Sequence, residues 1–390
     1  MKGLKKGISA ALAAALILTA LPVDGISRVH AAADATIKML PEEASTFNDT
    51  DYDGLGEFQG WGTSLCWWAN RLGYSERLTS EAAAKFYGDD GLDLNIGRYN
   101  VGGGDNVTGG EYAEENEFLH AAHIERSDSM VPGYCQDVTK MDLKIHDLAY
   151  YTDNFDRADE TSGYAWNYNW TADQRQLAIL EAAMKASGED FIAEAFSNSP
   201  PYFMTNSGCS SGAEKSSEDN LRKDCYKAFA AYMADVVVHW AEVGFVDFTS
   251  TTPMNEPYTS YWGANSKKQE GCHFDQGESE STIIEEYYDE LQRQLKAAKN
   301  ENVKRMLSNL IICGTDETSI DTAISSYNKL SDKAKNSIQR IDTHTYGGSK
   351  RAELSALAER EGKNLWMSEI DVGGKAGTDA GEMAPALCFA

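Results

Sequence analysis

The chain has 390 residues, with 35 Lys and Arg against 61 Asp and Glu, which gives a formal net charge of −26. A field this negative repels nucleic acid and anionic lipid, so neither is an expected partner. A neutral or weakly charged substrate fits the composition better. The 7 cysteines are too few for disulfides to carry the fold of so long a chain.

The N-terminus has the parts of an export signal. Lysines at positions 2, 5 and 6 precede the apolar run 8–23, and Ala31 to Ala33 follow it. The run is shorter than the roughly 20 residues of a membrane span, so we expect cleavage rather than anchoring. The mature protein should then be secreted and extracellular, a monomer with no membrane contact once the signal is cleaved.

The rest of the chain predicts three consecutive regions and one large domain. We expect 1–33 to be the signal peptide, 34–57 an N-terminal segment and 58–390 a single catalytic domain. From residue 58 onward, short apolar or β-branched runs alternate with amphipathic stretches. The expected strands are 58–63, 92–100, 191–196, 245–251, 309–313, 341–346 and 364–368, and the expected helices are 80–87, 173–186, 221–243, 281–300, 320–330 and 350–361. This alternation is typical of an α/β fold with a parallel sheet, here a (β/α)8 TIM barrel.

Two stretches depart from the rhythm. Residues 101–170 are long, weakly periodic and rich in Gly, Asp, Asn and Tyr, which indicates an elaborated βα loop that forms a cleft wall. Residues 384–390 resemble the first turns of a helix, and no eighth strand follows them. A barrel needs that strand to close, so we expect a chain that is truncated before strand eight.

The cysteines and the metal-like patterns leave few firm expectations. Cys209 and Cys225 flank a Ser- and Gly-rich loop and could close it or stay reduced, and Cys313 is expected to be a buried free thiol. The acidic run 49–54 has the spacing of a calcium loop, but Gly60 stands where the last ligand should be. We therefore expect no metal and no cofactor.

Two glutamates follow candidate strands directly, where barrel enzymes build their active sites. Glu256 lies in Met-Asn-Glu-Pro after the fourth strand, and Glu369 lies in Trp-Met-Ser-Glu at the end of the seventh. These strands stand on opposite sides of a barrel, so the two carboxyl groups can face each other across a cleft. Cleavage of a glycosidic bond needs one carboxylic acid to protonate the leaving oxygen and one carboxylate to attack or to activate water.

Six ordered segments resemble glycoside hydrolase family 30, in particular its branch that includes endo-β-1,6-galactanases. The resemblance spans residues 58–390. The matching segments are Phe-Gln-Gly-Trp-Gly-Thr-Ser-Leu-Cys-Trp-Trp-Ala from 58, Asn-Ile-Gly-Arg-Tyr-Asn-Val-Gly-Gly-Gly-Asp from 95, Ser-Asn-Ser-Pro-Pro from 197, Met-Asn-Glu-Pro from 254, His-Thr-Tyr from 344 and Trp-Met-Ser-Glu from 366. We expect the chain to lack the eighth strand, and also the β-sandwich that accompanies the barrel in this family.

The resemblance implies a role for each matching residue. Glu256 would be the acid/base and Glu369 the nucleophile of a retaining, double-displacement reaction. Asn255 would contact the sugar 2-hydroxyl. Arg98 and Tyr346 would hold the carboxylate of Glu369, and Asp105 would bind hydroxyls of the cleaved sugar unless it is only a turn residue after the glycines. The other substrate-binding candidates are Asn198, His344 and the aromatic cleft residues Phe196 and Trp366. His344 could instead be a core histidine, and Arg98 a plain ion pair.

The sequence therefore predicts a secreted retaining endo-glycoside hydrolase that acts on a β-linked polysaccharide, with β-1,6-galactan as the leading substrate. Two alternatives stay open. The same fold could act on β-1,6-glucan or glucuronoxylan, or the chain could be a non-catalytic carbohydrate-binding fragment.

Overall fold

The computed structural model describes residues 58–104, 131–134, 168–264, 266 and 268–371. The expected signal peptide, the segment 34–57, Asp105 and most of the long loop lie outside the described residues, as does any strand after residue 371. Gly60–Ile370 form one compact unit. The second unit, Met1–Gln59 with Asp371–Ala390, contributes no helix or strand among the described residues.

Within the described residues, seven parallel strands make up the sheet, and each strand pairs with the next one along the chain. This confirms the expected fold class, because sequential parallel strands joined by helices build a TIM barrel. The strands are β1 (Gly62–Ser64), β2 (Ile96–Asn100), β3 (Ile192–Phe196), β4 (Ser250–Thr252), β5 (Ile311–Glu317), β6 (Arg340–His344) and β7 (Asn364–Glu369).

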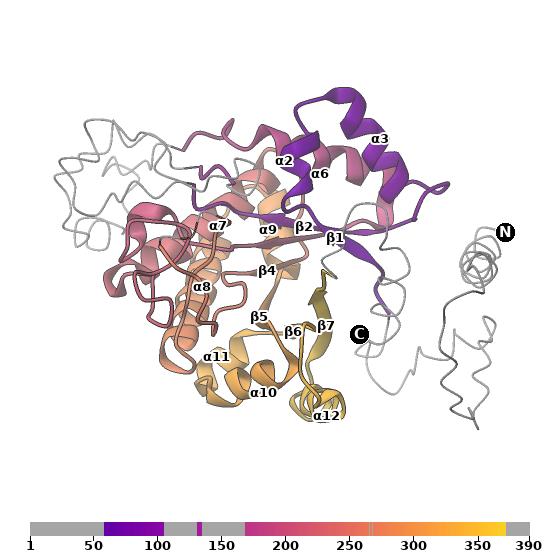
Figure 1. Ribbon diagram of the computed structural model, residues 1–390. Coiled ribbons are helices and arrows are strands. Elements are labelled where there is room, and N and C mark those ends of the chain that lie inside the picture. The colour runs from indigo at the N-terminus through magenta and orange to yellow at the C-terminus, as the bar shows by residue number, and fades with distance from the viewer. Residues whose placement is uncertain (1–57, 105–130, 135–167, 265, 267, 372–390) are drawn as a thin grey trace, which may run out of the picture. The chain divides into compact units, whose positions relative to one another are not determined.

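Helices surround the strands (Figure 1). The group α2, α3 and α6 lies beside β1 and β2, while α10, α11 and α12 lie toward β5, β6 and β7. The described α-helices are α2 (Trp68–Leu72), α3 (Glu76–Phe86), α6 (Gln174–Ser187), α7 (Tyr226–Glu242), α8 (Glu278–Ala297), α9 (Glu301–Asn309), α10 (Ile320–Lys329), α11 (Asp332–Ser337) and α12 (Arg351–Glu361). Short 3-10 turns η3 (Gly188–Asp190), η4 (Tyr202–Met204) and η5 (Lys223–Cys225) complete the elements.

Side-chain caps fix where several of these helices begin. The side chain of Ser75 accepts from the backbone N–H of Leu78 and starts α3. The same bond is made at the start of α9 by Asn300, of α10 by Ser319 and of α11 by Ser331. Such caps satisfy N–H groups that have no partner inside the helix. They explain two short helices, α9 and α11, that the periodicity alone did not predict.

Every strand differs from its expected bounds by at least one residue, and β1, β2, β4 and β5 differ by four residues or more at one end. The stretch 245–249, expected as the start of a strand, is loop, and β4 begins only at Ser250. Its apolar side chains, including Phe248, are buried against the core without sheet pairing. In contrast β5 continues to Glu317, four residues past the expected end, and β6 begins one residue early, at Arg340. The hydrophobic run therefore predicted too early a start for β4. The end of β5 was predicted too early because its last residues are polar.

The strands present polar side chains to the inside of the barrel and apolar ones to the helices. On β2, Arg98 binds carboxylates from other strands, whereas its neighbour Tyr99 packs on Phe248 with ring centroids 6.0 Å apart. The apolar core therefore lies between the strands and the helix layer. It includes most of α7, where Phe229 has no exposed surface.

Cys209, Cys225 and Cys313 are all buried free thiols. The expected state of Cys313 is thus the observed one, and the loop between Cys209 and Cys225 is not closed by a disulfide. Burial is the main cause that raises the pKa of Cys225 and of Cys313, so both thiols stay protonated.

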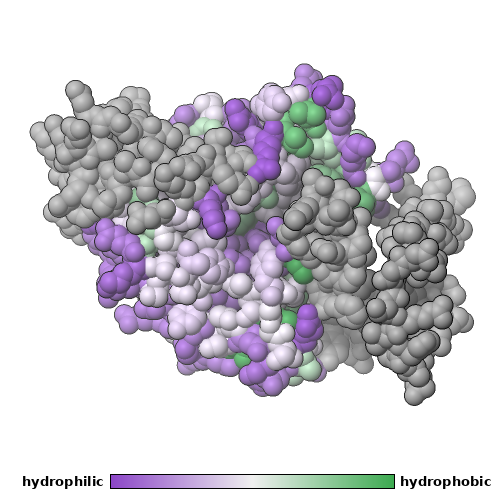
Figure 2. Space-filling model, viewed as in Figure 1, coloured by the Kyte–Doolittle hydropathy of each residue, from purple (hydrophilic) through white to green (hydrophobic). Residues whose placement is uncertain are grey.

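The visible surface of the described part is mostly hydrophilic or neutral, with small apolar areas near α2 and α3 (Figure 2). Within the described residues, no helix combines the length and the apolar character that a membrane crossing requires.

Truncation of the buried ring in α7 should destabilise the barrel. Phe229→Ala is expected to lower the free energy of unfolding by about 3–5 kcal/mol, because it removes apolar contacts and leaves a cavity. Lys227→Ala, at an exposed position of the same helix, should change it by less than about 0.5 kcal/mol. Urea unfolding followed by far-UV circular dichroism measures both. Equal effects of the two substitutions would contradict the assignment of the core.

Candidate active site

Glu256 and Glu369 meet at the carboxyl ends of the strands. Glu256 comes four residues after the end of β4, and Glu369 is the last residue of β7. A carboxylate oxygen of each lies within 4.8 Å of the other and of a ring nitrogen of His344. Two carboxyl groups from positions 113 residues apart thus share one site (369 − 256).

The backbone at Glu256 adopts a left-handed conformation, with φ 47°. This conformation costs a non-glycine residue about 1–3 kcal/mol, so the surroundings must hold it. The N–H of Glu256 donates to the carbonyl of Asp316 at 2.8 Å, and the indole N–H of Trp262 donates to the carbonyl of Glu256 at 3.1 Å. The strained turn aims the side chain into the barrel mouth instead of along the loop.

Each carboxylate oxygen of Glu256 has its own partner. Nδ1 of His344 lies 3.0 Å from Oε1. The phenol of Tyr261 hydrogen-bonds Oε2, and lies 3.2 Å from the hydroxyl of Thr318 on its other side. Glu256 is 6% exposed, so these two contacts fix the orientation of a nearly buried group.

Glu369 is held by one cation and one phenol. Nη1 of Arg98 donates to Oε2 at 2.9 Å, and the hydroxyl of Tyr346 donates to Oε1 at 3.0 Å. Its side chain keeps 27% exposure and therefore remains accessible from the mouth of the barrel. The two oxygens of Glu369 thus each accept from a different donor.

Arg98 contacts more of the site's polar side chains than Glu369 alone. Besides Glu369 it binds Asp316 and Glu194, with Nε 3.1 Å from Oε1 of Glu194, and its Nη2 donates to Oδ1 of Asn255 at 3.2 Å. Burial alone would lower the pKa of this guanidinium, but the charges of Asp316, Glu369 and Glu194 raise it above its usual value. For Asp316 burial has the opposite effect and would raise the pKa, but Arg98 and His344 lower the pKa of this carboxyl to about 2.

His344 is a buried cation between the carboxylates. Its Nδ1 lies 3.9 Å from Oε1 of Glu369, and its Nε2 lies 3.3 Å from Oδ1 of Asp316. Burial lowers the pKa of the imidazole, but the charge of Glu369 and the contacts to Asp316 and Glu256 outweigh burial and raise the pKa to about 10. At neutral pH the ring therefore carries a proton on both nitrogens.

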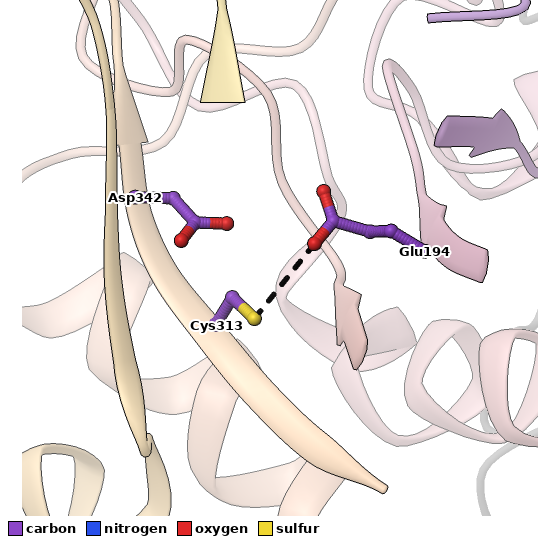
Figure 3. Close-up of side chains that lie close together, drawn as sticks. All are labelled: Glu194, Cys313 and Asp342. Atoms are coloured by element: carbon purple, nitrogen blue, oxygen red, sulfur yellow. Dashed lines mark hydrogen bonds between the residues drawn. The ribbon is translucent and has the colours of Figure 1, made fainter. Parts of the chain in front are cut away.

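A second ionic layer lies below the site. Arg340 binds Glu194 and Asp342, with Nε 2.6 Å from Oδ1 of Asp342. Figure 3 shows Glu194, Cys313 and Asp342 turned toward one another, with the thiol 4.0 Å from Glu194. Burial raises the pKa of Asp342 to about 7, although Arg340 opposes the rise.

Three clusters of described residues have the donor atoms that a metal ion needs, and each has a competing explanation. Glu194, Cys313 and Asp342 are already neutralised by the guanidinium of Arg340 and include a protonated thiol. In the second cluster, Asp219, His273 and Asp275, the carboxylate of Asp219 accepts hydrogen bonds from Ser279 and from the N–H of Asp275. The third cluster is Glu256, His344 and Glu369, in which His344 is itself a cation. Ion pairing and hydrogen bonding account for all three.

The remaining predicted residues have different surroundings. Asn255 lies in the site, bound to Arg98. Phe196 and Trp366 lie against the two buried arginines, with the guanidinium of Arg98 3.6 Å from the Phe196 ring centre and that of Arg340 3.4 Å from the Trp366 ring centre. Asn198 follows β3 and lies 3.8 Å from the sulfur of Cys66. Asp105 lies outside the described residues.

Sequence reasoning missed Asp316, Tyr261 and the lower ionic layer. Arg340 and Asp342 alternate with His344 along β6, so their period of two could have identified one inward face. Asp316 was hidden because β5 was expected to end before it. Tyr261 lies in a loop, where no periodicity marks a functional side chain.

The charge on His344 predicts a pH-dependent contribution to stability. Because the folded pKa, about 10, exceeds the ordinary value of 6.5, the contribution is complete below pH 6.5 and is lost as the pH rises through 10. The unfolding free energy of wild type minus that of His344→Gln should therefore shrink steadily from pH 6 to pH 10. Urea unfolding at pH 6, 8 and 10 measures it. A difference that is constant over this range would mean that the imidazole is neutral.

Known proteins share much of this chain. The family model for O-glycosyl hydrolase family 30 matches residues 146–309. An endo-β-1,6-galactanase of Hypocrea rufa is 33% identical over 331 residues, which cover 82% of this chain and 60% of that protein. An exo-β-1,6-galactobiohydrolase of Bifidobacterium longum is 26% identical over 95% of this chain and 27% of that protein. The chain thus spans well under two thirds of the length of each curated relative.

Solved structures agree on the fold. A conserved exported protein from Bacteroides fragilis matches with a TM-score of 0.58 and 20% identity, over 82% of this chain and 61% of that one. The protein SrfJ from Salmonella typhimurium matches with a TM-score of 0.54 and 15% identity, over 82% and 58%. Its parallel barrel strands, the family-model match over 146–309 and the galactanase relative make the chain similar to O-glycosyl hydrolase family 30.

Proposed function

We propose that this chain is the catalytic part of a retaining endo-β-1,6-galactanase in which Glu256 is the acid/base and Glu369 the nucleophile. The observation that carries the proposal is the meeting of these two carboxyl groups, with oxygens within 4.8 Å, at the carboxyl ends of the barrel strands. Retaining glycosidases hold their carboxyl groups about 5–5.5 Å apart, whereas inverting ones keep about 6.5–9.5 Å. The short separation supports double displacement, because no water molecule needs to fit between the nucleophile and the sugar.

The environments of the two groups support the division of roles. Glu369 accepts from Arg98 and Tyr346 and keeps an accessible carboxylate, as a nucleophile requires. Glu256 is nearly buried, and its carboxyl can exchange a proton at Oε2, since Oε1 faces the cationic His344. Glu369 thus has a donor on each oxygen of an accessible carboxylate, whereas Glu256 has one oxygen, Oε2, that faces Tyr261 and not a cation.

The proposed reaction has two balanced steps. In the first, an oxygen of Glu369 bonds to the anomeric carbon while the glycosidic bond breaks, and the leaving oxygen takes the electron pair and the proton of Glu256. In the second, water attacks the anomeric carbon, Glu256 takes back one proton, and the bond to Glu369 breaks with its electron pair returning to the carboxylate. Arg98 and Tyr346 stabilise that carboxylate at the start and at the end of the cycle.

The substrate part of the proposal rests on the relatives. The fungal relative is described as an endo-β-1,6-galactanase and the bacterial one as an exo-β-1,6-galactobiohydrolase, so both names specify β-1,6-linked galactose. The net charge of −26 suits a neutral polymer. We propose that the protein acts outside the cell, as expected from the N-terminal signal pattern, and as a monomer.

Removal of the nucleophile provides the first test. Glu369→Ala should lower hydrolysis of β-1,6-galactan by at least about a thousandfold, because no glycosyl-enzyme can form. Azide should restore turnover and give a glycosyl azide with inverted configuration. Reducing-sugar release and NMR of the product measure this, with the exposed Glu353→Ala as control. Wild-type rates in Glu369→Ala would refute the assignment.

A panel of pure polysaccharides tests the substrate. The wild-type protein should release oligosaccharides from β-1,6-galactan and much less from β-1,6-glucan or glucuronoxylan, as judged by chromatography of the products. Preferential release from one of the other two polymers would keep the mechanism and change the substrate. Binding to a polymer without any release would favour a non-catalytic carbohydrate-binding role.

A further inference from the structure

The β4–α8 loop carries a second functional group besides Glu256. Tyr261 lies five residues further along this loop, and its phenol binds Oε2 of Glu256. The residue is 52% exposed, although its hydroxyl is engaged with Glu256 and with the Thr318 hydroxyl. The hydroxyl of Tyr261 therefore contacts the Glu256 carboxyl, while its ring is exposed to solvent.

The contact marks which oxygen of Glu256 handles the proton. His344 is protonated on both nitrogens at neutral pH, so its Nδ1–H can only donate to Oε1. A carboxyl proton on Glu256 must then reside on Oε2, the oxygen next to Tyr261. The leaving oxygen of the substrate must approach that same oxygen.

A phenol with two partners can serve both protonation states of Glu256. When Glu256 is ionised, the Tyr261 hydroxyl donates to Oε2 and accepts from the hydroxyl of Thr318. When Glu256 is protonated and no substrate is bound, the hydrogen bond can reverse, so that Tyr261 accepts from Oε2–H and donates to Thr318. The carboxyl thus keeps one orientation until the leaving oxygen of the substrate replaces Tyr261 as the acceptor of that proton.

We propose that Tyr261 is a positioning residue for proton transfer by Glu256, and that its exposed ring forms a wall of the subsite for the leaving-group sugar. This inference rests on the proposed glycosidase function. Burial and the neighbouring Glu256 charge raise the pKa of the phenol, so Tyr261 keeps its proton throughout. It touches the acid/base group itself, unlike Tyr346, which binds the nucleophile.

The test separates proton transfer from the rest of the reaction. Tyr261→Phe removes the hydroxyl and keeps the ring. Two substrates share the sugar unit of the polymer that the panel identifies, attached β to either 2,4-dinitrophenol or phenol. Dinitrophenolate leaves without protonation, whereas phenol needs the general acid.

The expected result is a selective loss. For Tyr261→Phe, kcat/KM on the phenyl glycoside should fall by about 10- to 100-fold, while kcat/KM on the dinitrophenyl glycoside changes by less than about threefold. Equal losses on both substrates, or no loss on either, would overturn the role of Tyr261. Thr318→Val leaves the phenol of Tyr261 with only one partner, so kcat/KM on the phenyl glycoside should again fall, but less than in Tyr261→Phe. If the ratio of the two kcat/KM values stayed unchanged in Thr318→Val, the reversal of the hydrogen bond would be wrong.

A matched control lies in the same loop. Tyr258 is 44% exposed, and its ring lies near His273 and Lys329 instead of Glu256. Tyr258→Phe should leave the ratio of the two kcat/KM values unchanged. If wild type releases nothing from the polymer panel and hydrolyses neither glycoside, the glycosidase function itself fails and the inference with it. If wild type hydrolyses both and Glu369→Ala hydrolyses neither, the Tyr261→Phe result tests the inference alone.

Discussion

The active site depends on one guanidinium that is buried inside a barrel. Arg98 binds carboxylates from β3, β5 and β7 and the amide of Asn255 after β4, so a single side chain ties the strand ends together. Removal of one partner from such a buried cluster costs about 3–5 kcal/mol, because it leaves a charge without compensation. The same contacts that fix Glu369 therefore also hold the strands that surround it.

The charge balance of the barrel interior explains how five carboxyl groups can crowd into one space. Three cations, on Arg98, Arg340 and His344, lie among the carboxyl groups of Glu194, Glu256, Asp316, Asp342 and Glu369. Asp316 stays ionised with its pKa near 2, while Asp342, with a pKa of about 7, can take up a proton. The site thus combines fixed anions with groups that can still exchange protons.

Backbone strain occurs at the same place. Of the three non-glycine residues with positive φ in the described part, Glu256 and Asp316 both lie in the site and are joined by the N–H of one and the carbonyl of the other. The left-handed turn after β4 turns Glu256 toward β6 and β7, where His344 and Glu369 lie. The left-handed backbone costs free energy there and fixes the direction of the Glu256 carboxyl group.

The sequence by itself determined the order of strands and helices and marked Glu256 and Glu369 as catalytic candidates, because hydrophobic alternation and strand-end motifs are local features. It also indicated Arg98, Asn255, His344 and Tyr346 through short segments that resemble a family. Only the tertiary structure decided which carboxylates share Arg98, that His344 is a cation, and that Tyr261 binds Glu256. Charge state and contact depend on groups that are distant in sequence, and closure of the barrel alone brings those groups within hydrogen-bond distance.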